Sequence, residues 1–263
     1  MPGIQAVKTA VDVHATRDEA METLQTVRDW LRYAVSRFNA AGLVYGHGTS
    51  NAVDEAAFLI LHTLNLPIDQ LEPWLEARLM RAERQALQSV IEARIETRKP
   101  APYLTNTAYI GVHRFYVDER VIVPRSYIGE LLARDGLSAV IEDAGRVERV
   151  LDLCTGSGCL AILAALVFPE ARIDAIDISA DALAVAARNV SDHHLGEQVH
   201  LLEGNLFGPV HGRRYDLIIA NPPYVARAKA DAFPPEYDAE PPLAHRGGED
   251  GLDLVRQIIA EAR

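Results

Sequence analysis

The first hundred residues carry apolar side chains at helical spacing in three stretches. Thr16 and Glu19 have the spacing of a capping box, and one helical face follows them, formed by Leu24, Val27, Leu31, Val35 and Phe38. Two more helices are predicted over residues 52–64 and 81–98. Prolines at positions 67, 73, 100 and 102 lie after or between these helices and indicate where they end. We therefore predict a small all-helical domain over residues 1–100.

The spacing changes from helical to alternating after residue 100. Apolar or small residues stand at every second position, with interruptions, from Tyr109 to Val123. Asp118-Glu119-Arg120 has the composition of a turn. We therefore predict a β-hairpin with its turn at residues 118–120, within a linker over residues 101–126.

Short apolar strands alternate with helical stretches in the rest of the chain. Strands are predicted over residues 148–153, 172–177, 199–202 and 215–220, and helices over 159–167 and 180–190. This alternation is typical of βαβ units that build a parallel sheet. Residues 127–263 are therefore predicted to form an α/β domain.

Two of these strands run directly into residues suited to ligand binding. VLDLCTGSGCLAI (150–162) predicts a strand, a tight turn at Gly156 and Gly158, and a helix start with free backbone N–H groups. In YDLIIANPPYV (215–225), two prolines follow Asn221 and hold it rigidly where the strand ends. Ligands of open α/β sheets bind at this end of the strands.

Composition and charge narrow the class of protein. The chain has 263 residues, 49% of them hydrophobic, and no apolar run long enough to predict a membrane span. Its net charge of −11 argues against general binding to nucleic acid and suits a basic protein partner. The only cysteines, Cys154 and Cys159, flank the glycine turn and predict neither a disulfide nor a zinc site. We expect a cytoplasmic protein without a metal.

The glycine turn alone fits two kinds of nucleotide-containing ligand. Gly156-Ser157-Gly158-Cys159-Leu160-Ala161 matches the dinucleotide-binding pattern, and Asp177 at the end of the next strand could accept hydrogen bonds from ribose hydroxyls. Asp152 lies at the strand end beside the turn, where its charge would repel a pyrophosphate but attract an α-ammonium group. This favours S-adenosylmethionine over a nicotinamide cofactor.

The combined motifs resemble one enzyme family. D-x-C-x-G-x-G, the acidic end of the second strand and the Asn-Pro-Pro-Tyr sequence resemble class I S-adenosylmethionine-dependent methyltransferases that methylate an adenine amine or a glutamine amide. FYVDERVIVPRS (115–126), PPEYDAEPPLA and EDGLDL resemble the bacterial protein-glutamine methyltransferases, over roughly residues 80–257. The similarity is greatest to the branch that modifies the third protein of the large ribosomal subunit. The release-factor branch usually continues Pro-Arg with Pro and acidic residues, where this chain has Ser126-Tyr127.

This resemblance implies a cofactor, a product and a site. S-adenosyl-L-methionine would be the methyl donor and S-adenosyl-L-homocysteine the product, and residues 1–100 would recognise a basic protein substrate. Asn205 stands where the family commonly has Asp, which leaves a carbonyl to bind an adenine amine. The residues implied for cofactor binding are Asp152, Thr155, Gly156, Ser157, Gly158, Asp177, Asn205, Leu206 and Asn221, and those implied for catalysis are Asn221, Pro222, Pro223 and Tyr224.

The chemistry gives the Asn-Pro-Pro-Tyr residues distinct roles. An amide nitrogen is a poor nucleophile because its lone pair is delocalised into the carbonyl. The side-chain oxygen of Asn221 and the backbone carbonyl of Pro222 can accept the two amide protons, which orients the nitrogen and localises its lone pair. Tyr224 can stack on the amide plane and tolerate a neighbouring sulfonium.

Other functions remain open from the sequence alone. A release-factor glutamine methyltransferase would share every motif. A DNA adenine methyltransferase would share the chemistry but is expected to carry a basic, base-flipping groove. A nicotinamide-dependent oxidoreductase leaves Asp152 and Asn-Pro-Pro-Tyr unexplained.

The end of the chain gives a further expectation. Class I methyltransferases resemble one another in a seven-stranded sheet, and here the helix after the fourth strand begins near Gly251, with Arg263 last. We therefore expect a fragment or truncated product whose fourth strand is an open edge of the sheet.

Overall fold

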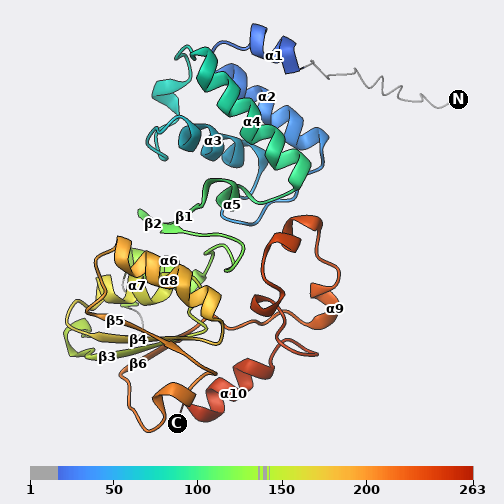
Figure 1. The fold of residues 1–263 in the computed structure, drawn as a ribbon. Coiled ribbons are helices and arrows are strands. Elements are labelled where there is room, and N and C mark those ends of the chain that lie inside the picture. The colour runs from blue at the N-terminus through green and yellow to red at the C-terminus, as the bar shows by residue number, and fades with distance from the viewer. Residues whose placement is uncertain (1–16, 136, 139–140, 142, 263) are drawn as a thin grey trace, which may run out of the picture.

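The computed structural model describes residues 17–135, 137–138, 141 and 143–262. In it, the predicted α/β class is confirmed: helices of the first hundred residues lie above a hairpin and a parallel sheet (Figure 1). None of the helices in the described ranges is long and apolar enough to cross a membrane.

The N-terminal part consists of helices packed around one apolar cluster. The helices are α1 (Arg17–Thr23), α2 (Val27–Ala40), α3 (Ala52–Thr63), α4 (Arg81–Thr97) and α5 (Ala101–Thr105), with a 3₁₀ turn at Glu72–Trp74. Trp30, Phe38 and Leu59 are completely buried at its centre. These helices account for the apolar spacing in the sequence.

The prediction of one continuous helix through residues 24–38 was wrong. The chain breaks after α1, and Thr26 starts α2 as its N-cap. The Thr26 hydroxyl accepts a hydrogen bond from the Asp29 amide at 3.2 Å, while the Asp29 carboxylate accepts one from the Thr26 amide at 2.9 Å. This reciprocal capping begins a new helix although the apolar spacing continues. The predicted cap at Thr16 lies outside the described residues.

The β-hairpin exists, but its turn is not where the sequence predicted it. β1 (Thr107–Ile110) pairs with β2 (His113–Tyr116), with Ile110 opposite His113. The turn is therefore Gly111-Val112, and the left-handed conformation of Gly111 (φ +57°) makes it possible. The alternation continues beyond β2 because Val117, Val121 and Val123 pack against α8 (Ala180–Asp192).

The parallel sheet has the strand order β5-β4-β3-β6. Its strands are β3 (Arg149–Leu153), β4 (Arg172–Asp177), β5 (Val199–Glu203) and β6 (Leu217–Ala220), close to the predicted ranges. Helices α6 (Tyr127–Asp135), α7 (Cys159–Val167) and α8 lie on one side and α10 (Asp253–Glu261) on the other (Figure 1). Within the described residues, β6 is an edge strand, as expected.

Alternate residues of each strand place their side chains on opposite faces of this sheet. Val150 and Ile173 pack with α7 on one face, whereas Leu151 and Ile176 pack with Ile258 of α10 on the other. Because both faces are covered, the strands are almost continuously apolar, which is why the sequence showed them clearly.

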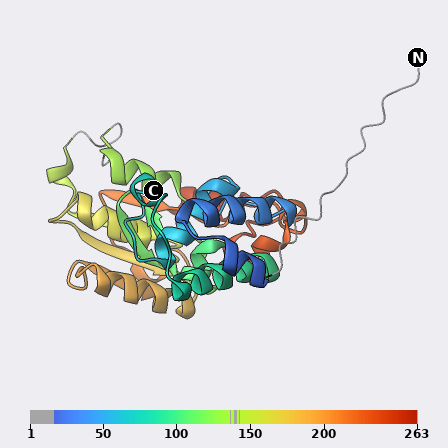
Figure 2. The ribbon, with the colours of Figure 1, turned by 90° about the horizontal axis from the view of Figure 1, so that it is seen from above.

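The segment between β6 and α10 connects the sheet to the helical part. It contains α9 (Arg227–Ala230) and 3₁₀ turns at Pro235–Ala239 and Pro242–Ala244. Two other 3₁₀ turns lie outside it, Ala144–Arg146 before β3 and Gly208–Val210 between β5 and β6. Viewed from above, the blue-to-teal helices lie over this orange-to-red segment (Figure 2). Glu236 makes the contact, pairing with Arg98 at 2.9 Å.

Candidate functional site

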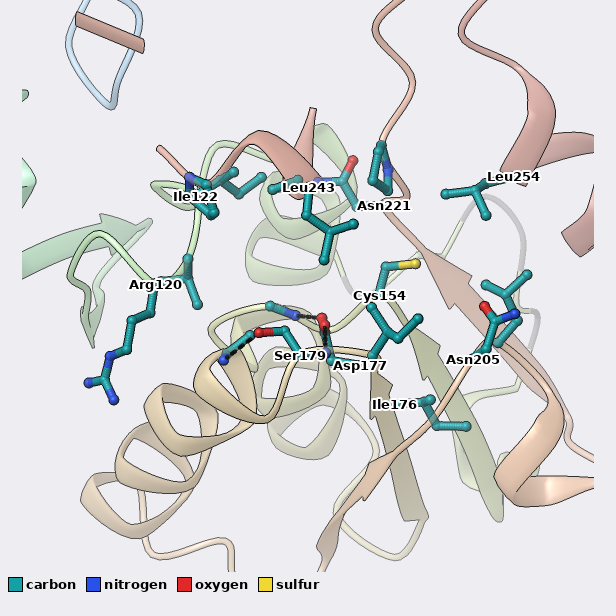
Figure 3. Close-up of a pocket in the computed structure, with 18 of the residues that line it drawn as sticks. Arg120, Ile122, Cys154, Ile176, Asp177, Ser179, Asn205, Asn221, Leu243 and Leu254 are labelled. Atoms are coloured by element: carbon teal, nitrogen blue, oxygen red, sulfur yellow. Dashed lines mark hydrogen bonds between the residues drawn. The ribbon is translucent and has the colours of Figure 1, made fainter. Parts of the chain in front are cut away.

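Two cavities meet at Asn221, where β6 ends. We call the first, of about 200 Å³, the turn cavity, because the glycine turn and the ends of β4 and β6 surround it. In Figure 3, Cys154, Asp177, Asn205 and Asn221 extend toward it from these different elements. Ile176, Ile178, Leu206, Leu243 and Leu254 give it apolar walls.

The glycine turn is tied to the next strand through Asp177. The Gly156 amide donates a hydrogen bond to one carboxylate oxygen of Asp177 at 2.8 Å, and the Ser179 amide donates to the other at 3.0 Å (Figure 3). Gly156 and Gly158 have φ of +55° and +78°. A Cβ on Gly158 would lie 3.1 Å from the Ala186 Cβ, so α7 can approach α8 closely only with glycine here.

The residues predicted for cofactor binding fall into two groups. Gly156, Asp177, Asn205, Leu206 and Asn221 line the turn cavity. The others belong to the same turn but are not among its lining residues; they are Asp152, Thr155, Ser157 and Gly158. Their direct contact with a cofactor stays a prediction.

Asp152 is completely buried beneath the turn. One carboxylate oxygen accepts a hydrogen bond from the Thr155 hydroxyl at 2.5 Å, and the other has no hydrogen-bond partner among the described residues. Removal from water raises the pKa of Asp152 to about 7, against the effect of the Thr155 hydrogen bond. An ammonium group near this carboxylate would hold it in its ionised form.

The Asn-Pro-Pro-Tyr residues are held in place by the segment that precedes α10. The Val225 amide donates to the His245 carbonyl at 2.9 Å, and the Gly247 amide donates to the Val225 carbonyl at 3.0 Å. A Cβ on Gly247 would come within 2.6 Å of the Pro223 carbonyl oxygen, so the approach requires glycine. Asn221 lines both cavities.

We call the second cavity, of about 150 Å³, the aromatic cavity. The Phe233 and Tyr237 rings stack with centroids 4.3 Å apart, and the exposed Tyr224 completes the aromatic set. Its lining residues are Ile122, Arg125, Asn221, Pro222, Tyr224, Val225, Phe233, Tyr237, Ala244 and His245.

Sequence reasoning assigned no role to Arg125, Phe233, Tyr237 or His245. Arg125 and Tyr237 belong to segments that carry the family resemblance, and Phe233 and His245 flank one of them, but nothing in the local pattern indicated that residues more than a hundred positions apart share one cavity. The proline-rich composition after residue 233 indicated only turns.

The turn cavity has features that fit S-adenosylmethionine. Asp177 offers carboxylate oxygens for ribose hydroxyls, and the aliphatic walls suit an adenine ring. The carboxyl group of Asp152 is buried beneath the turn, where a nearby ammonium group would favour its ionised form. No cluster of side chains suited to a metal ion occurs in the described ranges.

Comparison with known proteins decides the family. The model of the family described as "Methyltransferase small domain" matches residues 136–233. A ribosomal protein uL3 glutamine methyltransferase of Burkholderia pseudomallei is 56% identical over 246 residues, covering 91% of this chain and 80% of the relative. The chain belongs to the ribosomal protein uL3 glutamine methyltransferase family. Proteins of the same description from Bordetella pertussis (55% identical, 92% of this chain and 80% of the relative) and Bradyrhizobium diazoefficiens (56%, 91% and 76%) agree.

Membership in this family confirms the resemblance drawn from the motifs. The fold is that of a class I methyltransferase sheet with helices of the N-terminal part and a hairpin attached. The chain is an enzyme with a methyltransferase domain, and a nicotinamide-dependent oxidoreductase is excluded as its class.

Proposed function

We propose that this enzyme transfers a methyl group from S-adenosyl-L-methionine to the side-chain amide nitrogen of a glutamine in ribosomal protein uL3. One observation carries the proposal: Asn221 lies between the turn cavity and the aromatic cavity. A donor and an acceptor bound in the two cavities would meet at this side chain.

The cofactor supplies, when bound, a methyl group already activated on a sulfonium sulfur. The residues of the chain would bind this cofactor and orient it. Asp177 would accept hydrogen bonds from the ribose, Asn205 and Leu206 would contact the adenine, and the turn from Asp152 to Gly158 would hold the amino-acid end. Leu206 is buried in a left-handed conformation (φ +46°), which fixes this loop against the cavity.

The Asn-Pro-Pro-Tyr residues would hold the substrate amide. The Asn221 side-chain oxygen and the Pro222 carbonyl accept the two amide protons, which turns the nitrogen lone pair toward the turn cavity. Pro222 and Pro223 fix the backbone, and Tyr224 covers the amide plane. Such alignment of a weak nucleophile contributes several kcal/mol, at most about 7–11.

The substrate assignment follows the names of the relatives and agrees with charge. A net charge of −11 favours a basic protein, such as one that binds ribosomal RNA, and disfavours direct binding of nucleic acid. We assign substrate recognition to residues 1–100, linkage to residues 101–126 and methyl transfer to residues 127–263, and we expect the enzyme to act in the cytoplasm without a membrane partner.

A methylation assay with several substrates tests the proposal. Purified enzyme and labelled S-adenosylmethionine are incubated with uL3, with a release factor and with adenine-containing DNA, and labelled residues are identified by mass spectrometry. We expect label on one glutamine of uL3. Label on the release factor alone would move the enzyme to the other branch, and label on none would overturn the proposed function.

A further inference from the structure

Glu240 is a buried carboxylate behind the aromatic cavity. Its side chain is completely buried. One oxygen accepts hydrogen bonds from the Val123 amide at 3.0 Å and from Nη1 of Arg125 at 2.5 Å, and the other accepts one from Nη2 of Arg125 at 2.7 Å. Nε2 of His245 lies 2.9 Å from this second oxygen. Nε2 of the buried His47 lies 3.6 Å from the same oxygen. Glu240 thus forms a bidentate pair with Arg125 and has two histidines beside it.

Of the side chains that face this carboxylate, Arg125 and His245 line the aromatic cavity, whereas His47 and Glu240 itself do not. The Arg125 guanidinium lies over the Tyr237 ring, with Cζ 5.7 Å from its centroid. Arg125 keeps 27% of its side chain exposed. A positive charge therefore stands beside the space in which the proposed substrate amide would lie.

An unpaired guanidinium at this position would favour binding of glutamate over glutamine. The carboxamide of glutamine and the carboxylate of glutamate have nearly the same shape, so shape complementarity alone cannot distinguish them. A guanidinium fork binds a carboxylate in a bidentate manner and much more strongly than a neutral amide. A cavity that takes glutamine needs this charge to be cancelled.

Glu240 remains ionised under ordinary conditions. Burial acts to raise the pKa of its carboxyl group, but the hydrogen bonds from Arg125 and the neighbouring His245 and His47 outweigh burial and hold the pKa well below its ordinary value. The pair with Arg125 is therefore between two full charges and is neutral as a whole.

We propose that Glu240 determines specificity for glutamine: by neutralising Arg125 it lets the aromatic cavity accept a carboxamide and reject the carboxylate of glutamate. The inference rests on the proposed function. Glu240 acts through Arg125 and His245 and does not touch the substrate, so it is a positioning and charge-setting residue.

The chain provides a matched control in Glu236. This glutamate is also completely buried and lies four positions earlier in the same segment. It accepts a hydrogen bond from the Val44 amide at 3.0 Å and pairs with Arg98, both in the helical part. Glu236→Gln removes the same charge from the same segment without changing the partner of a cavity residue.

The experiment compares two peptides on the complete enzyme. One peptide contains the target glutamine, unmethylated, with its neighbours in the sequence. The other has glutamate at that position and serves as a competitive inhibitor. KM for the first and the inhibition constant for the second are measured for wild type, Glu240→Gln and Glu236→Gln, with thermal melting and S-adenosylhomocysteine affinity as controls of folding.

We expect Glu240→Gln to bind the glutamate peptide better relative to the glutamine peptide: the inhibition constant divided by KM should fall by about tenfold or more. In Glu236→Gln this ratio should stay within about threefold of wild type. An unchanged ratio in Glu240→Gln, or an equal shift in both variants, would overturn the inference.

A second variant, Glu240→Asp, serves if Glu240→Gln does not fold. It shortens the side chain and loosens the pair with Arg125, and we expect a shift of about threefold in the same direction. No shift in Glu240→Asp would also overturn the inference. A wild-type enzyme that methylates no glutamine would instead refute the proposed function, and this inference with it.

Discussion

Asn221 is the residue on which the proposed transfer depends most directly. Its position at the end of β6 is fixed by the following prolines and by the hydrogen bonds that join Val225 to residues 245 and 247. Because the fold holds the backbone, the side chain can be removed without disturbing the sheet. The same side chain borders both cavities, so its loss affects donor and acceptor alignment together.

We expect Asn221→Ala to lower kcat by about a hundredfold or more, since one preorganised polar group at a reaction centre is worth that much. Methyl incorporation into uL3 under saturating cofactor measures it. S-adenosylhomocysteine affinity and the melting temperature should stay near wild type. Activity within about tenfold of wild type would refute the role of Asn221.

In the proposed function, Asp177 binds the ribose of the cofactor, away from the reacting atoms. Its carboxylate organises the turn through Gly156 and Ser179 and borders the turn cavity. Ribose contacts are the same in the ground state and the transition state, so they contribute uniform binding. We expect Asp177→Ala to weaken S-adenosylhomocysteine binding by about tenfold or more in calorimetry and to change saturated kcat less. Asp177→Asn keeps an acceptor and should lose less affinity; an unchanged dissociation constant in Asp177→Ala would contradict the assignment.

Asp152 predicts a pH dependence of cofactor binding. The pKa of about 7 means that the protonated form dominates below pH 7 in the ligand-free enzyme. A ligand that carries an ammonium group binds the ionised form, so binding releases a proton and affinity rises as pH increases through this pKa.

Calorimetry with S-adenosylhomocysteine measures this dependence. The affinity of the wild type should increase about tenfold from pH 6 to pH 8, because the ionised fraction of a group with this pKa increases by about that factor. Asp152→Asn cannot ionise and should show a flatter profile and weaker binding. Parallel profiles for the two proteins would show that Asp152 does not sense the ammonium group.

Among the elements, α2 shows how a local hydrogen-bond pair overrides an apolar pattern. Thr26 and Asp29 cap this helix reciprocally, and the backbone hydrogen bond from Thr26 holds the pKa of Asp29 below its ordinary value. Trp30 and Phe38, both on α2, are completely buried, so the start of the helix sets the position of core side chains.

Thr26→Ala should lower the free energy of unfolding by about 1 kcal/mol, the usual cost of losing an N-cap. Thr23→Ala is the control: Thr23 is exposed at the end of α1, and its hydroxyl donates a hydrogen bond to the Glu19 carbonyl of its own helix. Denaturant unfolding of both variants gives the comparison. Equal losses would mean that the cap at Thr26 has no special weight.

At the scale of the molecule, buried charges join the helical part to the segment after β6. Arg94 is completely buried; its Nε donates to Glu55 at 2.6 Å, and its Nη2 donates to the Val44 carbonyl at 3.1 Å. The adjacent Glu236 comes from the other side of this contact, with Arg98 as its closest cation. Loss of Arg94 would leave Glu55 buried without its cation.

We expect Arg94→Met to destabilise the protein by about 3–5 kcal/mol, because removing one partner of a buried pair leaves an uncompensated charge. Arg28→Met breaks the exposed pair with Glu76 and should cost less than about 1 kcal/mol. Thermal and denaturant unfolding measure both. A loss at Arg94 no larger than that at Arg28 would show that the buried pair contributes little.

The sequence by itself determined most of the elements and several of the residues that line the turn cavity. Apolar strands such as β4 and helices such as α7 are determined by patterns within a few residues, and both were found at their observed bounds. Gly156, Asp177 and Asn221 could be placed near one another because parallel strands end at the same edge of a sheet.

The apolar pattern missed the turn of the hairpin and the break before α2, which local residues set, and only the tertiary structure decided the aromatic cavity. In the first two cases an apolar pattern continues past the end of an element because Val117 and Val27 are buried for other reasons, against α8 and against the helical core. The aromatic cavity brings Arg125 together with Tyr237 and His245, and its charge is set by Glu240. The contacts of the aromatic cavity join residues more than a hundred positions apart, and no local pattern of residues encodes them.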